Sequence, residues 1–354
     1  MADPTSPIPQ DGQDGQDGKP KRRRRGGVAH RKKRDASLPP AYVREPIRGE
    51  RARPTAAQSA KAPDYLVIGH ICADLLEDGT AVLGGTSIYS ALTAANLGLR
   101  VGVITRGKYG QVADGIAIPG LEEYADRIQI IVQDADHPTI FVNRYSGGRR
   151  TQHVRSWAGE IDLKGIPPHW LNAKIIHLGP ICQEIDLRTT GILQPEFLGA
   201  TPQGWMRDWR TTANGLVKHI PLRLPADLMS RLDAVIVSDE EIAQAREVVE
   251  WVGARRLGVV TLGDQGARII YGGARADLPG FPIKTVDLTG AGDVFATAFF
   301  VKASDRSASA IDAGRFANAT AALSLTGIGP TGVPTRAEVE ALLATNSDLR
   351  QLHR

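Results

Sequence analysis

Short runs of apolar, often β-branched residues alternate with stretches of helical character along most of this chain. Helical stretches such as "SIYSALTAANLG" and "DEEIAQAREVVEWVG" lie between several of the runs. Continuous apolar strands that alternate with helices are typical of a mostly parallel sheet covered on both faces. The pattern therefore predicts a doubly wound α/β domain. Its expected strands are "DYLVIG" (64–69), "RVGVIT" (100–105), "AKIIHLG" (173–179), "LDAVIVS" (232–238) and "LGVVTLG" (257–263).

The composition is that of a protein that folds in water. Hydrophobic residues make up 42% of the chain, yet no apolar run reaches the roughly 18 residues that a membrane span needs. No apolar segment typical of a secretory signal follows the N-terminus. Two cysteines, Cys72 and Cys182, are too few for a disulfide framework and lack metal-ligand neighbours in the sequence. We therefore expect a cytoplasmic protein with no membrane partner.

Positive charge is concentrated at the N-terminus. Residues 1–62 carry 15 Lys and Arg against 7 Asp and Glu, whereas the remaining residues carry 28 basic and 32 acidic residues. The N-terminal segment also contains a DGQ repeat, "KPKRRRRGG" and few large apolar residues, which is typical of disorder. It is either a solvated extension, the reading that we favour, or an electrostatic tether to nucleic acid. We expect a disordered tail at 1–62, one domain at 63–345 and a short tail at 346–354.

One segment departs from the alternation of strands and helices. "TIFVNRYSGGRRTQHV" (Thr139–Val154) has two extended runs on either side of Ser146-Gly147-Gly148 and predicts a β-hairpin. Open α/β sheets bind ligands outside the carboxyl ends of their strands. The hairpin is therefore either a flap over such a site or an edge that extends the sheet.

The segment "TVDLTGAGDVFATAFF" (Thr285–Phe300) places two glycines and an alanine directly before an apolar helix. Gly290, Ala291 and Gly292 leave the backbone unobstructed, and unpaired N–H groups at a helix N-terminus attract anions. The segment therefore predicts a cradle for a phosphoryl group.

Asp293 follows this cradle directly. In phosphoryl transfer, a carboxylate near the acceptor hydroxyl can take its proton while backbone N–H groups stabilise the transferred group. Alternatively, Asp293 only caps the helix, a contribution of about 1 kcal/mol. The local sequence leaves both roles open.

Several motifs, in order, resemble those of the ribokinase-like (PfkB) carbohydrate kinases. "DLTGAGDVF" resembles the family's C-terminal signature D-T-x-G-A-G-D-x-F, with Leu288 in place of its Thr. "LGGTSIYSALTAANLG", "VVTLGDQGA" and "FANATAALSLTGIGPTGVPTRAEVEALL" resemble its Gly-Gly segment, its nucleotide-binding segment and its C-terminal helices. The resemblance covers residues 64–345. It implies an α/β/α sandwich with a small β lid, and it favours the flap over the edge for the hairpin.

The resemblance also implies the roles of individual residues. Asp293 would be the general base and the backbone of Gly290, Ala291 and Gly292 the anion hole. On the acceptor side it implies Asp74, the glycines Gly84 and Gly85, and Asp287. On the ATP side it implies Thr261, Gly263 and Gly266 in a loop, with Asn318 on the helix beside the adenine.

"VSDEEIA" has Ser238 where the family usually has Asn, but it retains Glu241. The family comparison implies that Glu241 helps to organise hydrated Mg²⁺ near the phosphates. Ser238 and Glu241 also have the spacing of a capping box before a helix. The two roles are compatible.

Other departures concern the acceptor. Tyr89 stands where many family members have an Asn that contacts the sugar, so the resemblance implies that Tyr89 is a substrate-binding residue. An aromatic ring cannot, however, reproduce the paired hydrogen bonds of an amide. The segments around 201–217, "SDEE" and "GIGPTGVP" are similar to the myo-inositol kinase-like branch of the family. Gln183, Glu184 and Arg207 are either polar substrate contacts or structural residues.

We therefore expect an ATP- and Mg²⁺-dependent kinase that phosphorylates a hydroxyl of a small polyol, a sugar or a cyclitol. Two alternatives are a nucleoside kinase of the same fold and a non-catalytic sensor of a polyol or nucleotide. The sequence leaves open whether the protein is a monomer or a homodimer.

Overall fold

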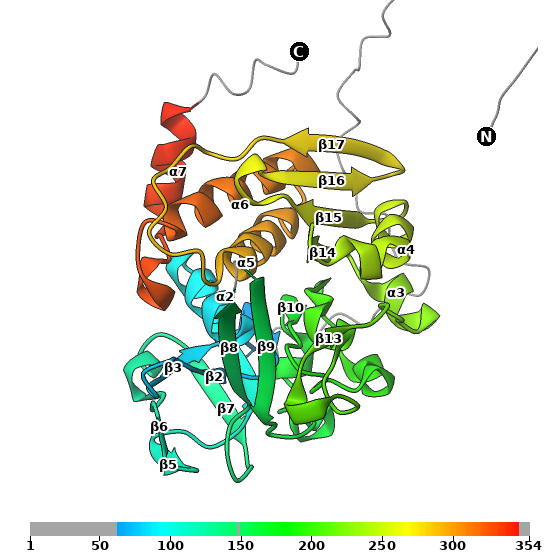
Figure 1. Ribbon diagram of the computed structural model, residues 1–354. Helices are drawn as coiled ribbons and strands as arrows, with labels where there is room; N and C mark the ends of the chain where they lie inside the picture. The colour runs from blue at the N-terminus through cyan, green and yellow to red at the C-terminus, as the bar shows by residue number, and fades with distance from the viewer. Residues whose placement is uncertain (1–61, 147–148, 347–354) are drawn as a thin grey trace, which may run out of the picture. The chain divides into compact units, whose positions relative to one another are not determined.

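A nine-stranded sheet organises the part of the chain that the computed structural model describes, residues 62–146 and 149–346 (Figure 1). Its strand order is β17-β16-β15-β14-β11-β10-β1-β4-β7, parallel from β15 to β7, with β16 and β17 antiparallel. All five strands expected from the sequence lie in this sheet. The strands are β1 (Tyr65–Ile68), β4 (Val101–Arg106), β7 (Gln129–Gln133), β10 (Ile175–Leu178), β11 (Phe197–Ala200), β14 (Ala234–Ser238), β15 (Leu257–Thr261), β16 (Ala267–Tyr271) and β17 (Ala274–Leu278).

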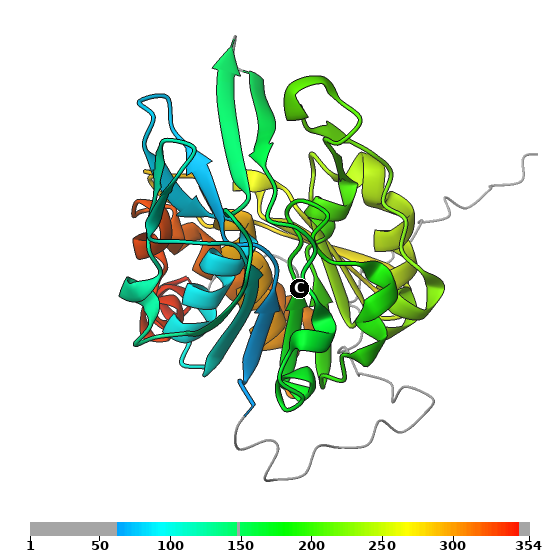
Figure 2. The ribbon, with the colours of Figure 1, turned by 90° about the horizontal axis from the view of Figure 1, so that it is seen from below.

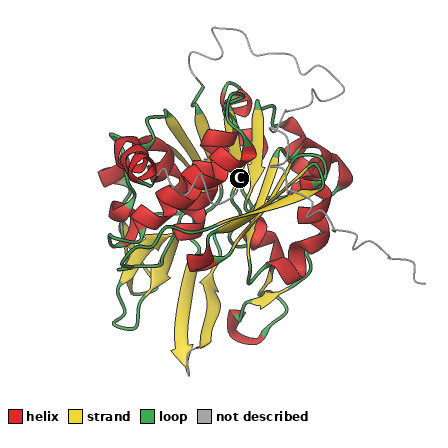
Figure 3. Cartoon of the chain, turned by 90° about the horizontal axis from the view of Figure 1, so that it is seen from above, coloured by secondary structure: helices red, strands yellow, loops and turns green. Residues whose placement is uncertain are grey.

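Helices cover both faces of the sheet, as a doubly wound domain requires (Figure 3). Because side chains alternate along a strand, Tyr65 and Val67 of β1 join the core under one layer, while Leu66 and Ile68 join the core under the other. The first layer contains α2 (Thr86–Asn96), α5 (Ala291–Ala303), α6 (Ala310–Ser324) and α7 (Arg336–Thr345), and the second contains α3 (Ala226–Arg231) and α4 (Ile242–Gly253).

The C-terminal helices begin at well-formed caps. Ser309 and Asp312 form a capping box at the start of α6, and Thr335 and Glu338 form another at the start of α7. By contrast, α5 begins at Gly290 with no side-chain cap. Most of α5 is nonetheless buried, so packing rather than capping holds this helix in place.

A second, four-stranded sheet in the order β3-β2-β8-β9 forms a lid. Strands β8 (Ile140–Ser146) and β9 (Arg149–Ser156) are antiparallel, which confirms the predicted hairpin, and Figure 2 shows the hairpin projecting outward. Strands β2 (Cys72–Leu75) and β3 (Ala81–Gly84) complete the sheet. The base of the lid rests on an apolar cluster of Cys72, Phe141, Val154, Ile181 and Cys182.

The remaining elements are short. They include the hairpins β5 (Gln111–Ala113) with β6 (Ile116–Ile118) and β12 (Arg207–Asp208) with β13 (Lys218–His219), and 3₁₀ turns such as η5 (Pro202–Met206), η7 (Gly263–Gln265) and η8 (Gly329–Gly332). Within the residues described, no helix is both long and apolar enough to cross a membrane. The tails expected at 1–62 and 346–354 lie almost entirely outside those residues, so the domain boundaries stay predictions.

The topology identifies one edge of the sheet as the place for a ligand. From β1 the chain winds first to β4 on one side and later to β10 on the other, so the strand order reverses at β1. Ligands of such sheets bind outside the carboxyl ends of the strands next to this reversal. The loops that follow β1, β10, β14 and β15 are therefore expected to form the site.

Candidate active site

The start of α5 forms an open cradle. Gly290 is its N-cap in the left-handed conformation (φ 77°), and a Cβ there would lie 2.2 Å from Cδ1 of Tyr89. Only glycine tolerates both conditions. A Cβ at Gly292, in contrast, would meet no atom within 4 Å. The N–H of Ala291 donates to the Leu288 oxygen (3.5 Å). Because the first N–H groups of a helix have no intrahelical partner, the N–H of Gly292 can reach an anion in this open space.

Asp293 lies in this first turn and is partly buried. Burial raises the pKa of its carboxyl to about 6, and the negative charge of Glu241 acts in the same direction. A hydrogen bond from Thr86 and the positive charge of Arg207 oppose this rise in pKa. The carboxyl group can therefore both accept and release a proton near neutral pH, as a general base must.

Asp74 and the Gly-Gly segment meet at the lid. Asp74 on β2 pairs with Val82 on β3, and a Cβ at Gly84 would lie 2.2 Å from Oδ2 of Asp74. The carboxylate therefore rests directly on the glycine, where any other residue would displace it. Burial raises the pKa of the Tyr89 phenol, and the charges of Asp287, Asp293 and Asp74 raise it further. These four predicted residues therefore lie near one another.

Two lid residues that we did not single out from the sequence extend this polar group. The side-chain amide of Asn143 on β8 donates to Oδ1 of Asp74 (3.3 Å), and that of Gln152 on β9 donates to Oδ1 of Asn143 (3.1 Å). Asn143 and Gln152 face each other across the hairpin. Because side chains alternate along a strand, the expected hairpin could have indicated that Asn143 and Gln152 lie on the same face.

Tyr89 lies against the turn that precedes α5. It is only 4% exposed, and its ring packs against the backbone of Gly290. The Tyr89 ring thus supports the turn before α5. Its contact with an acceptor stays a prediction.

Asp287 connects two loops. Its Oδ1 accepts from the N–H of Thr289 (2.9 Å) and its Oδ2 from the N–H of Gly329 (2.9 Å). Burial acts to raise the pKa of this carboxyl, but the two backbone donors outweigh it and the pKa is lowered. Asp287 therefore holds the turn before α5 against the η8 segment.

The predicted nucleotide residues gather where β15 ends. Thr261 is the last residue of β15, and Gly263 and Gly266 enclose the turn η7. The Asn318 side chain donates to the backbone oxygens of Leu278 (3.4 Å) and Pro279 (3.1 Å). A Cβ at Gly266 would lie 2.2 Å from the same Leu278 oxygen, so Asn318 fixes the segment against which this loop packs.

The capping box predicted at Ser238 is not formed. Ser238 is the last residue of β14, and Glu241 itself is the N-cap of α4. One half of the motif exists, because Oε2 of Glu241 accepts from the backbone N–H of Ser238 (2.9 Å). The N–H of the intervening Asp239 donates to the Thr261 oxygen (2.9 Å), which links this loop to the end of β15. Strand pairing with β15 therefore overrides the local capping pattern.

Glu184 and Gln183 bind protein groups. Glu184 is fully buried, and its carboxylate accepts from the N–H groups of His70 (2.9 Å), Ile181 (2.8 Å) and Cys182 (2.6 Å). Gln183 donates to the backbone oxygen of Arg207. These bonds support the structural reading of the two residues.

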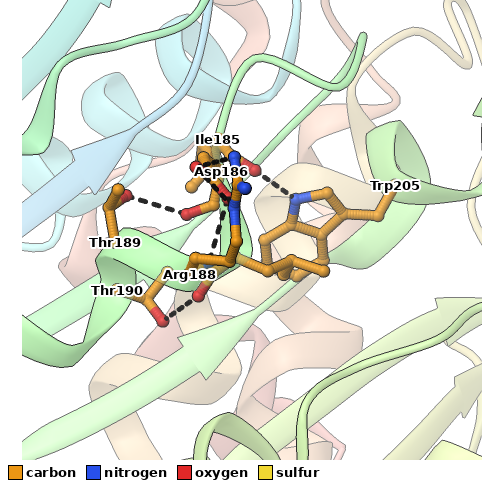
Figure 4. A network of polar contacts seen from close by, with 7 residues as sticks. Ile185, Asp186, Arg188, Thr189, Thr190 and Trp205 are labelled. Atoms are coloured by element: carbon orange, nitrogen blue, oxygen red, sulfur yellow. Dashed lines mark hydrogen bonds and ion pairs between the residues drawn. The ribbon is translucent and has the colours of Figure 1, made fainter.

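Arg207 follows the turn η5 and lies close to the site. Its guanidinium donates to the backbone oxygen of Ile181 (2.8 Å) and to Oε1 of Gln203 (2.7 Å). The turn itself is anchored, because the indole N–H of Trp205 donates to the backbone oxygen of Ile185 (2.9 Å; Figure 4). Arg207 thus has structural bonds, and its charge also reaches Asp293.

A cavity of about 700 Å³ lies elsewhere, beside the lid. It is lined by Leu75, Val142, Arg144, His153 and Arg155 and by residues between Trp209 and Gly215. Val142 and Arg144 alternate with Phe141 and Asn143, so this cavity adjoins the lid face opposite to Asp74. It is separate from the group around Asp293.

The site fits a magnesium ion held mainly by substrate phosphates. Among residues 62–146 and 149–346, no group of three His, Cys, Asp or Glu has the arrangement of a protein metal cage. Mg²⁺ commonly uses one or two carboxylates, several waters and phosphate oxygens. Glu241 fits this role, because its carboxylate is held in place by the Ser238 N–H through Oε2 and its charge reaches Asp293.

The chain is similar to known proteins over the region that contains several of these residues. The sequence model of the pfkB family carbohydrate kinases matches residues 228–336, which include Glu241, Thr261 and the start of α5. A cytidine kinase of Thermococcus kodakarensis is 28% identical over 248 residues, 67% of this chain and 87% of that protein.

Two solved structures share the fold. One is a pyrophosphate-dependent kinase in the ribokinase family complexed with a pyrophosphate analog and myo-inositol (TM-score 0.62, 20% identity, 78% of this chain and 99% of the other). The other is Arabidopsis thaliana ribokinase complexed with ribose and ATP (TM-score 0.55, 20% identity, 80% and 99%). At these identities the likeness concerns the fold, which is the ribokinase-like α/β fold with a small β lid. Together, the motifs, the fold and the match over residues 228–336 make this chain similar to the PfkB family of carbohydrate kinases, which are phosphotransferases.

Proposed function

We propose that this kinase transfers a phosphoryl group from ATP to a hydroxyl of a small polyol, a sugar or a cyclitol such as inositol. The observation that carries the proposal is Asp293, a carboxyl with a pKa of about 6 in the first turn of α5, beside the open space at Gly292. A base and an anion cradle within one helical turn suit phosphoryl transfer.

The lid supports a hydroxyl-rich acceptor. Asp74, Asn143 and Gln152 form a continuous row of carboxylate and amide groups on one face of the lid. Such groups both donate and accept hydrogen bonds, as neighbouring hydroxyls of a polyol require. The inositol bound to one structural neighbour is consistent with this class of acceptor.

The donor would bind between the loop after β15 and the start of α5. Thr261, Gly263, Gly266 and the segment fixed by Asn318 would contact ATP, and Glu241 would orient water around Mg²⁺. Bound Mg²⁺ would neutralise charge on the donor phosphates. Because one structural neighbour is pyrophosphate-dependent, the nucleotide is a proposal to be tested against pyrophosphate.

The reaction follows from these positions. The acceptor oxygen would attack the γ-phosphorus, and the bond between this phosphorus and the bridging oxygen would break to release ADP. Asp293 would take the proton of the acceptor hydroxyl. The N–H of Gly292 would face the charge on the transferred group, and that of Ala291 would have to exchange its bond to the Leu288 oxygen (3.5 Å) to do the same.

A nucleoside acceptor is the second candidate. The observation in its favour is the cytidine kinase that is similar over 87% of its own length. The polar row on the lid suits the ribose of a nucleoside as well as a free polyol. In both cases Asp293 would act as the general base.

The test is a panel of acceptors. The protein lacking residues 1–61 is incubated with Mg²⁺ and either ATP or pyrophosphate, together with inositols, pentoses, hexoses or nucleosides, and product formation is measured. We expect turnover with ATP and one class of polyol, and none in the matched D293N variant. Turnover with nucleosides alone would overturn the polyol proposal, and turnover with pyrophosphate alone would overturn ATP as the donor.

A further inference from the structure

The cavity beside the lid lies between the lid hairpin and the 209–217 loop, which connects β12 with β13. His153 on β9, the edge strand of the lid, forms a β-bridge with Leu216, and Figure 1 shows β13 beside β9. A Cβ at Gly215 (φ 68°) would lie 2.2 Å from the Val154 oxygen, so the loop approaches the strand as closely as a glycine allows. The 209–217 loop is therefore attached to the edge of the lid and closes one side of the cavity.

The ionisable side chains that line this cavity are basic. The hairpin supplies Arg144 on β8 with His153 and Arg155 on β9, and the loop supplies Arg210. Among the residues that the structure describes, no Asp or Glu belongs to the lining. Clefts lined by charges of one sign focus their field and attract ligands of the opposite sign. The cavity therefore favours an anionic ligand.

The two arginines of the hairpin are available to such a ligand. The register of β8 and β9 shifts between Ile140 and Phe141, which leaves Arg155 as an extra residue, a β-bulge, in β9. Bulges redirect side chains and are frequent next to functional sites. In the part of the chain that the structure describes, the guanidinium groups of Arg144 and Arg155 form no hydrogen bond or ion pair. Their N–H donors are therefore unused.

Arg210 is held in place at the other side of the cavity. Its guanidinium lies over the ring of Trp157 (4.3 Å from the centroid) and over that of Trp209 (5.1 Å). Its Nη1 also donates to Oε1 of Gln183 (2.8 Å). A guanidinium carries five N–H donors, so others remain for a ligand. Arg210 thus offers a positioned positive charge opposite the two arginines of the hairpin.

The size and the walls of the cavity indicate the class of ligand. Its volume of about 700 Å³ is that of a small-molecule site, for which roughly 300–1,000 Å³ is usual. Leu75, Val142 and Trp209 line it as well, and their apolar surfaces can contact a carbon skeleton. Arginine binds phosphate with two parallel hydrogen bonds. A small organic phosphate uses both the arginines and the apolar walls, whereas an inorganic anion uses only the arginines.

We propose that this cavity is a second ligand site, which binds a small organic phosphate between Arg144, Arg155 and Arg210 and thereby ties the lid hairpin to the 209–217 loop. The site requires neither the acceptor nor the phosphoryl donor of the proposed reaction. It therefore goes beyond the proposed function and does not depend on it.

The cavity and the proposed acceptor site share strand β8. Arg144 lines the cavity, whereas the neighbouring Asn143 donates to Asp74 on the opposite face of the lid. Because successive side chains of a strand point to opposite faces, one strand carries both groups. A ligand that restrains Arg144 therefore also restrains the strand that positions Asn143.

The first experiment measures the binding of fructose 1,6-bisphosphate to the full chain by calorimetry, without Mg²⁺ or a phosphoryl donor. The test variant is R144Q/R155Q, and the matched control is R223Q, which removes an exposed arginine outside the cavity. We expect the wild type and R223Q to bind alike and R144Q/R155Q to bind about tenfold more weakly or less, because charge-assisted hydrogen bonds to phosphate are lost. Arg144 and Arg155 are exposed, so the double variant should keep the fold.

Only differences between the three proteins are interpreted, because all of them retain the basic N-terminal residues and the cradle at α5. Equal affinities in the three proteins would place the anion at one of those positions and would overturn the proposal. No binding by the wild type at millimolar concentrations of the bisphosphate would also overturn it.

Pyrophosphate tests the organic part of the ligand. It carries two phosphoryl groups, as the bisphosphate does, but it has no carbon skeleton to contact the apolar walls. We expect the loss of affinity caused by R144Q/R155Q to be accompanied by weaker binding of pyrophosphate than of the bisphosphate to the wild type. Equal or tighter binding of pyrophosphate at this site would contradict an organic phosphate as the ligand.

Hydrogen exchange tests the tie between the hairpin and the loop. With the bisphosphate bound, amide exchange in β9 and in the 209–217 loop should slow in the wild type and in R223Q, but not in R144Q/R155Q. Binding without this protection would overturn the tie, and protection confined to the start of α5 would place the ligand at the phosphoryl-transfer site. Neither measurement requires turnover, so a failure of the proposed kinase activity would leave both results interpretable.

Discussion

Asp287 and Asp293 lie on either side of the same glycine turn, yet their surroundings differ in kind. Both oxygens of Asp287 accept from backbone N–H groups, and its pKa is lowered despite burial. Asp293 has the hydroxyl of Thr86, and burial raises its pKa to about 6. The first carboxylate stabilises the loop, whereas the second is held in a state of higher free energy in which it can take up a proton.

The difference shows how one short segment separates structure from chemistry. Backbone donors are fixed, so a carboxylate that binds them is stabilised in its charged form. Glu184 is a further example, with backbone donors to a fully buried carboxylate. A carboxylate without such donors beside an open cradle is the one to test for catalysis.

The largest expected effect is on turnover. D293N should lower kcat by about 10³-fold or more, within the range of general-base contributions, because the amide cannot take the proton. Nucleotide affinity, measured by calorimetry, should change little. D287N is the matched control and should retain far more activity, so comparable losses in both variants would break the distinction between the two aspartates.

The next largest expected effect is a difference in stability between alanine substitutions at the two glycines of the turn. G290A places a Cβ 2.2 Å from the ring of Tyr89 at φ 77°, which should cost about 2–4 kcal/mol of unfolding free energy. G292A meets no atom within 4 Å and replaces a helical glycine, so it should stabilise the fold by up to about 1 kcal/mol.

Urea unfolding compares these two stabilities, and turnover is measured in parallel. G292A should still lose activity, because its methyl group enters the space that the transferred group would occupy. Full activity in G292A would place that group elsewhere.

The smallest expected effects are on the pH dependence of the unfolding free energy, and they have opposite signs for the two aspartates. Since the pKa of Asp293 rises from 3.8 to about 6 on folding, its ionisation destabilises the folded state progressively above pH 4 and fully above about pH 6. D293N should therefore raise the unfolding free energy at pH 8 by about 1–3 kcal/mol and change it little below pH 4.

Asp287 has the reverse linkage. Its lowered pKa contributes stability that is present above pH 3.8 and is lost as the pH falls through the folded value. D287N should lower the unfolding free energy at pH 8 by about 1 kcal/mol. The same sign for both variants in urea titrations would contradict this part of the comparison.

The sequence was sufficient for the features that local patterns carry. The five expected strands, the hairpin and the helix after Gly290-Ala291-Gly292 are all present, because alternation and glycine positions act over a few residues. Strands β7, β11, β16 and β17 were not predicted. Strands β7, β16 and β17 include exposed or polar positions, such as "ARADL" in β17, so they lack the continuous apolar run of a buried strand. Strand β11 is buried throughout, but its four residues, "FLGA", are a short run that contains a glycine.

Contacts between distant segments could not be read from the chain. Thr86 and Gln203 meet only because β10 and η5 are brought beside the start of α2. The capping box at Ser238 failed for the same reason, since its pattern is local but pairing with β15 decides where the strand ends. The buried Glu184 and the packed ring of Tyr89 likewise depend on segments far away in sequence.

The apolar cluster at the base of the lid gives the protein an internal chemical reporter. Cys72 and Cys182, the two cysteines of the chain, are 2% and 0% exposed there. Burial raises the pKa of both thiols, the carboxylate of Glu184 raises both further, and that of Asp74 acts on Cys72, so neither forms the reactive thiolate readily. Alkylation therefore requires the lid to leave its base, and the rate of labelling by a small thiol reagent measures how often it does so. A ligand that closes the lid would protect both thiols, and this protection could be followed by mass spectrometry before any acceptor is known.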